Sequence, residues 1–150
     1  GDGAWSDLLR TYYVLVRRTL AKYRGREANV AGDGFLATFD GPARAVRCAL
    51  ELTREVRGLG VEIRAGVHIG ECEVIGDDVG GVAVHTGARI MAEATPGEVL
   101  ASGTIKDLVA GSGLSFTDRG EHALKGVPGR WSLFTATACP RSSSYWRSRR

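Results

Sequence analysis

Residues 61–69 read VEIRAGVHI, a stretch in which apolar side chains alternate with polar ones or glycine. Successive side chains point to opposite faces of a β-strand, so this alternation predicts a strand with one apolar face and one polar face. Arg64 and His68 share the polar face. The elements on either side of this strand decide the fold.

Two predicted helices precede the strand. Apolar residues recur every three or four positions in 5–23 and again in 46–56, which is the spacing of one helical face. Gly25 is expected to end the first helix. The second helix begins near Pro42, a residue favoured in the first turn.

A predicted hairpin lies between these helices. The runs 28–30 and 35–39 flank Gly32-Asp33-Gly34, and an Asp-Gly between two such runs is a strong hairpin signal. Taken alone, Asp33 is more often chosen for turn geometry than for function. The alternative is a carboxylate at the hairpin tip that binds Mg²⁺.

The remaining elements follow the strand in an order typical of an α+β domain. They are a short strand at 73–75, a helix at 81–94, a strand at 99–101, a helix from Ser102 to 109, and strands at 115–117 and 131–135. This order predicts a ferredoxin-like antiparallel sheet covered by helices. A ferredoxin-like layout begins with a strand, and that first strand is absent from this sequence.

Length, charge and composition exclude several classes to which this protein could belong. The chain has 150 residues, enough for one domain with a single core, and its composition is not that of a disordered chain. Four arginines lie in the last ten residues, and without them the formal net charge of +3 falls to about −1, which argues against nucleic-acid binding. The three widely spaced cysteines fit a reducing cytoplasm, and no apolar run is long enough for a membrane span.

Two regions are predicted along the chain. Residues 1–137 form the folded domain, and residues 138–150 form a basic Ser/Arg-rich tail that is expected to be disordered. The sequence begins with Gly1 instead of Met, so further sequence is expected upstream.

Several side chains could carry chemistry, although each has a simpler explanation. His85 and Arg89 are four positions apart on one predicted helix, so they share a face that could bind an anion or be a solvated stripe. Lys125 lies in a glycine-rich loop, where it could be solvated or reach a phosphate. Asp77-Asp78 most often caps or turns a chain. An acidic hairpin tip, a helical arginine and a loop lysine together predict a site that handles phosphate groups.

The amino-acid sequences of four motifs make the predicted phosphate-handling site more specific. They are AGDGFLATF (31–39), RAGVHIGE (64–71), VAVHTGARI (82–90) and RGEHALKGVPG (119–129). In this order they resemble the class III adenylate/guanylate cyclase catalytic domain, from about Gly1 to Phe134. The resemblance is closest to a bacterial subgroup with His where most members have Asn.

The resemblance implies roles in metal and phosphate binding for four residues. Asp33 matches the second of two metal-binding aspartates, and Arg89 matches the arginine that stabilises charge on the α-phosphate in the transition state. Lys125 and Arg64 match cations that hold the triphosphate. The family's first strand, with its other metal aspartate and a backbone turn for the triphosphate, does not precede Gly1.

The resemblance also implies a nucleoside-binding set. Asn29 and Asp78 fall where the family places its purine-reading pair, which is usually Lys and Asp, so Asn29 is a departure. His85 matches the ribose-orienting Asn, and an imidazole can make a comparable hydrogen bond.

The implied activity is conversion of ATP to 3′,5′-cyclic AMP and pyrophosphate, with some use of GTP. Two Mg²⁺ or Mn²⁺ ions are expected in a complete site, as is a homodimer with its sites at the interface. The alternative is an inactive cyclase-like module that binds nucleotide or dimerises to regulate a partner. An RNA-binding ferredoxin-like domain is disfavoured by the near-neutral charge and the lack of paired aromatics on a strand.

Overall fold

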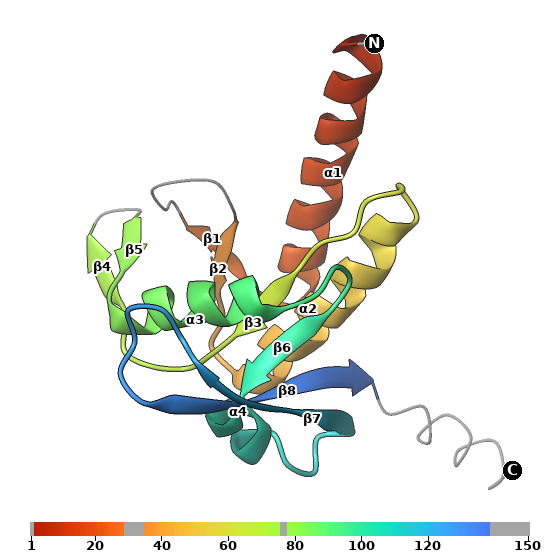
Figure 1. The fold of residues 1–150 in the computed structure, drawn as a ribbon. Helices are drawn as coiled ribbons and strands as arrows, with labels where there is room; N and C mark the ends of the chain where they lie inside the picture. The colour runs from red at the N-terminus through yellow and green to blue at the C-terminus, as the bar shows by residue number, and fades with distance from the viewer. Residues whose placement is uncertain (1, 29–34, 76–77, 139–150) are drawn as a thin grey trace, which may run out of the picture.

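The computed structural model describes residues 2–28, 35–75 and 78–138 (Figure 1). Their elements are, in chain order, α1 (Asp2–Lys22), β1 (Arg26–Ala28), β2 (Leu36–Thr38), α2 (Pro42–Arg57), β3 (Ala65–Val67), β4 (Glu73–Ile75), β5 (Asp78–Gly80), α3 (Val82–Glu93), β6 (Val99–Ser102), α4 (Gly103–Leu108), β7 (Leu114–Ala123) and β8 (Arg130–Ala138). The predicted α+β class is confirmed. Among the described residues, no helix is both long and apolar enough to cross a membrane.

The central sheet has four strands in the order β3-β6-β8-β7, and β1-β2 and β4-β5 form two separate hairpins. The pairs β6-β8 and β7-β8 are antiparallel, as predicted. The pair β3-β6 is parallel, because α3 carries the chain back across the sheet between the two strands. The sheet is therefore mostly antiparallel.

The central strand β6 explains how helices cover both faces of this sheet. All four of its residues are buried. Val99 and Ala101 lie in a cluster with Val46 of α2, whereas Leu100 lies in a cluster with Ile90 of α3. Because alternate residues of a strand face opposite sides, α2 and α3 cover opposite faces of the sheet.

The pairing of the two predicted hairpin strands is confirmed beside α1, whereas the predicted turn at Gly32-Asp33-Gly34 lies outside the described residues. β1 and β2 are antiparallel, with Ala28 opposite Leu36. Gly25 does not adopt the left-handed conformation expected at the end of the first helix; Arg24 does, with φ 58°. Gly25 serves packing instead, because a Cβ built there would lie 2.6 Å from Cε2 of Phe39.

Several strand lengths differ from the prediction. β3 is shorter than 61–69, because its partner in the described residues is β6, which has four residues. β7 and β8 are longer than predicted, since they pair with each other across most of their length, with a bulge between Asp118 and Glu121. β8 extends to Ala138, so the first residue of the predicted tail belongs to a strand, and residues 139–150 lie outside the described residues.

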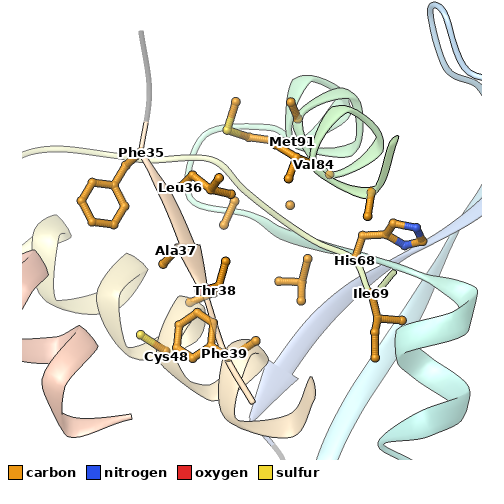
Figure 2. A pocket seen from close by; sticks show the side chains of 18 of the residues that line it. Phe35, Leu36, Ala37, Thr38, Phe39, Cys48, His68, Ile69, Val84 and Met91 are labelled. Atoms are coloured by element: carbon orange, nitrogen blue, oxygen red, sulfur yellow. The ribbon is translucent and has the colours of Figure 1, made fainter. Parts of the chain in front are cut away.

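A groove separates the β1-β2 hairpin from the four-stranded sheet. Within the described residues, β2 pairs only with β1 and β3 pairs only with β6. Residues of both strands line a cavity of about 1330 Å³, which we call the β2–β3 groove. Figure 2 shows Leu36 to Phe39 on one side of the groove and His68 on the other, with Met91 of α3 nearby.

Candidate functional site

Helix α3 carries the predicted pair His85 and Arg89 one turn apart. Thr86 and Ile90 form its buried face, and Thr86 Oγ1 donates a hydrogen bond of 2.9 Å to the carbonyl of Val82. His85 is exposed and Arg89 is partly buried. The helix period places them together on a face beside the buried one, as the sequence predicts.

The depth at which α3 lies on the sheet is set by Gly66 of β3. A Cβ built on Gly66 would lie 2.5 Å from the backbone nitrogen of Met91 and 2.6 Å from the carbonyl oxygen of Gly87. The helix backbone therefore rests directly on the strand, and the absence of a side chain at position 66 determines how far His85 and Arg89 stand from the sheet.

The loop between β7 and β8 brings Lys125 beside α3. Leu124 is buried in the cluster that contains Ile90 of α3, and the N–H of Val127 donates a 3.0 Å hydrogen bond to the carbonyl of Leu124, which closes the turn. Lys125 is exposed at this turn. The structure thus brings together α3 and the predicted loop lysine, which are distant in sequence.

Arg64 lies directly before β3. Both Arg64 and His85 line the β2–β3 groove. The Arg64 side chain is exposed. Arg89 and Lys125 are not among the residues that line this groove. Of the four predicted residues whose side chains are described, His85 and Arg89 belong to α3, Lys125 lies in the loop packed against it, and Arg64 and His85 line the groove.

For the other three predicted residues, the structure does not describe the side chains. Asn29 and Asp33 lie outside the described residues. Asp78 begins β5, where its backbone pairs with Ile75 of β4, and its side chain is not described. Their roles remain predictions.

His68 lines the groove and was not predicted as a site residue. Its Nδ1 lies 2.9 Å from Oγ of Ser102, and its ring meets Trp131 edge-on with centroids 5.3 Å apart. Burial lowers the pKa of His68, which favours the neutral ring. In the sequence, His68 could be recognised only as a histidine on the polar face of an alternating strand, where a side chain is expected to be solvated.

Ser102 links this histidine to α4. Its Oγ accepts a 3.4 Å hydrogen bond from the N–H of Ile105, as the predicted helix cap requires. The same oxygen contacts His68, so the end of β3 and the start of α4 share one hydroxyl group.

The described residues contain no group of three His, Cys, Asp or Glu side chains arranged to hold a metal ion. Mg²⁺ prefers several oxygen ligands in octahedral geometry. The predicted ligand Asp33 is outside the described residues, so the described part of the chain does not by itself fit a magnesium site.

Comparison with curated proteins identifies a sequence relative. The chain is 32% identical over 114 residues to Putative adenylate cyclase 3 of Rhizobium meliloti, a match that covers 70% of this chain and 19% of that protein. The match covers only 19% and 28% of the length of the first two curated relatives. No protein-family model matches.

Comparison with solved structures identifies the fold. The adenylyl cyclase CyaB from P. aeruginosa matches with a TM-score of 0.80 and 22% identity, over 93% of this chain and 85% of that one. An adenylate/guanylate cyclase/hydrolase from Silicibacter pomeroyi matches with a TM-score of 0.72 and 27% identity, over 88% and 86% of the two chains. A third match, the non-canonical dimeric guanylyl cyclase domain of the RhoGC fusion protein from Blastocladiella emersonii, has a TM-score of 0.70 and 15% identity, over 89% of this chain and 84% of that one.

Proposed function

By its fold the chain belongs with the class III adenylate/guanylate cyclases, and on this premise we propose that it is the catalytic domain of an adenylate cyclase that converts ATP to 3′,5′-cyclic AMP and pyrophosphate. The observation that carries the proposal is the contact between α3 and the loop of Lys125. Leu124 packs with Ile90, and Gly126 lies against His85. The positions that the resemblance assigns to ribose and triphosphate therefore lie on adjoining surfaces.

The proposed reaction is an intramolecular displacement at the α-phosphate. The ribose 3′-oxygen forms a bond to the α-phosphorus, and the bond from this phosphorus to the oxygen bridging to the β-phosphate breaks. Pyrophosphate leaves with the bonding electron pair, and the 3′-hydroxyl proton passes to solvent. The product is the cyclic phosphodiester.

Four described side chains have proposed roles in this reaction. Arg89 stabilises the charge that develops on the α-phosphate, which is the kind of interaction that lowers the barrier most. His85 orients the ribose. Lys125 and Arg64 neutralise the triphosphate, and both are exposed cations that a nucleotide can reach.

We propose that Asn29 and Asp78 contact the purine. Asp78 can accept from the adenine amino group, whereas the Asn29 amide carries both a donor and an acceptor and can be turned to suit either base. ATP is then the preferred substrate, with measurable use of GTP.

A divalent cation, Mg²⁺ or Mn²⁺, belongs to the proposed complete site, with Asp33 as one ligand. When bound, such ions would acidify the attacking hydroxyl and hold the leaving group. The described residues supply no cluster of ligands for them, so we assign no further residue to metal binding.

The proposed assembly is a homodimer with the sites at its interface. The RhoGC domain, which shares the fold, forms a non-canonical dimer, so the placement of the sites at the interface rests on the family resemblance. A two-fold dimer would carry two equivalent sites.

Product formation tests the proposal. Cyclic AMP and pyrophosphate would be measured by chromatography after incubation of a natural chain that contains residues 1–150, called the longer chain below, with ATP and Mg²⁺ or Mn²⁺. We expect both products with either cation and neither product when a chelator removes the cation. A longer chain that binds ATP without converting it would contradict the cyclase assignment.

A further inference from the structure

A glycine in the loop between β7 and β8 lies against the imidazole of His85. Gly126 has φ +76°, and a Cβ built on it would lie 3.2 Å from Nε2 and 3.8 Å from Cε1 of His85. The first value is tighter than ordinary van der Waals contact. Any other residue at position 126 would therefore press on the His85 ring, in addition to adopting a backbone conformation that side chains disfavour.

The loop cannot easily move away to relieve such a contact. Leu124 is only 4% exposed and lies in the cluster with Ile90, five residues after His85 on α3. The hydrogen bond from the N–H of Val127 to the carbonyl of Leu124 fixes the turn that contains Lys125 and Gly126. The His85 side chain is exposed, so its ring can be pushed toward solvent more easily than the packed loop can move. A side chain at position 126 would therefore displace the ring before it displaced the loop.

We propose that Gly126 is a positioning residue, whose missing side chain lets the His85 ring lie against the loop that carries Lys125. The proposal rests on the proposed cyclase function for its effect on turnover. Its structural part, the placement of the His85 ring, does not depend on that function.

Gly129 provides a matched control in the same loop. It has φ +83°, close to that of Gly126, but a Cβ built on it would meet nothing within 4 Å. Alanine at either position carries similar backbone strain, whereas only alanine at position 126 meets His85. A difference between the two variants therefore isolates the contact with the ring.

The experiment has a readout that does not need catalysis. NMR spectra of the histidine Hε1–Cε1 groups would be recorded for residues 1–150 and for Gly126→Ala and Gly129→Ala, with the His85 signal assigned by its loss in His85→Ala. We expect the His85 signal to shift in Gly126→Ala and to stay in place in Gly129→Ala. Gly126→Asn is a second test, because asparagine tolerates positive φ better but still carries the Cβ. An unmoved His85 signal in both position-126 variants would overturn the proposal.

Turnover of ATP by the longer chain tests the consequence for the reaction. We expect Gly126→Ala to lower kcat by up to about 10²-fold, because small displacements of a substrate-orienting group are costly, and Gly129→Ala to have a much smaller effect. In the His85→Ala background the two glycine variants should have equal kcat values. Equal effects of both variants with His85 present would overturn the link to turnover. If no form of the protein makes cyclic AMP, the proposed function fails while the NMR comparison still decides the placement of the ring.

Discussion

The carboxylate of Glu98 accepts two hydrogen bonds from the guanidinium of Arg119, with Nε–Oε2 and Nη2–Oε1 distances of 2.7 and 3.0 Å. The Thr135 hydroxyl and the Thr95 N–H also donate to this carboxylate. The Glu98 side chain is only 9% exposed. The carboxylate of this residue, which directly precedes β6, therefore links β7, β8 and the loop between α3 and β6 through hydrogen bonds.

Glu98 should make stability depend on pH. Its hydrogen bonds, led by those from Arg119, lower its pKa from 4.5 to about 2. Because folding lowers this pKa, the stabilisation is complete above about pH 4.5 and is lost as the pH falls through about 2. We expect Glu98→Gln to lower the free energy of unfolding by about 2 kcal/mol at pH 7, and the difference from wild type to shrink at pH 4 and pH 3. Urea denaturation at the three pH values measures this, and a difference that does not change with pH would contradict it.

Gly66→Ala should destabilise the fold. The added methyl would meet the backbone of α3 at Met91 and Gly87, and backbone cannot rotate out of the way. Overpacking of this kind costs about 1 to 3 kcal/mol. Urea denaturation measures the loss. Gly87→Ala is the matched control, because a Cβ at that helical position meets nothing within 4 Å and should stabilise the helix by about 0.5 to 1 kcal/mol.

Arg89→Ala should lower kcat by about 10² or more and leave ATP binding almost unchanged, because the proposed guanidinium contact strengthens only as charge develops on the α-phosphate. Steady-state kinetics of the longer chain would separate kcat from KM. Arg89→Lys keeps the charge without the planar donor pair and should recover only part of the rate. A loss confined to KM would be evidence against the assigned role.

ATP should be preferred over GTP by less than about 10⁴ in kcat/KM, since larger discrimination requires a site that leaves buried polar groups unpaired with the wrong base. An amide at position 29 does not impose such a requirement. Parallel measurements with both nucleotides test this. Asn29→Lys should change the ratio, and a ratio above that limit in the wild type would show that other groups read the base.

Most of the order of elements could be predicted from the sequence because most elements carry their own periodic signal. The short strand β5 was not predicted, since Asp78 at its start was read as part of a cap or turn. The stripe in 46–56 predicted α2, and the Asp-Gly signal predicted the β1-β2 pair, which the register Ala28 to Leu36 confirms. The length of β3 could not be predicted from its own alternation, since a strand extends only as far as its neighbour pairs with it.

In the candidate site, too, local spacing could be predicted from the sequence, whereas contacts between distant segments could not. The shared face of His85 and Arg89 follows from a local spacing of four residues, whereas the contact between His85 and Gly126 joins positions that no periodicity relates. His68 was overlooked because its neighbours in space, Ser102 and Trp131, come from β6 and β8 and bury a position that alternation alone would expose.

The β2–β3 groove has a consequence for how the protein unfolds. No strand pairing in the described residues joins the hairpin to the four-stranded sheet, and each side has its own apolar cluster. α2 contributes to both, through Cys48 on the hairpin side and Val46 on the sheet side. Because strand pairing in the described residues does not join the hairpin to the sheet, the hairpin side should open at a lower free energy than the sheet. In residues 1–150 the amides of β1 and β2 should exchange with solvent at lower opening free energies than those of β6 and β8, so that α1 and the hairpin form an early-opening subdomain.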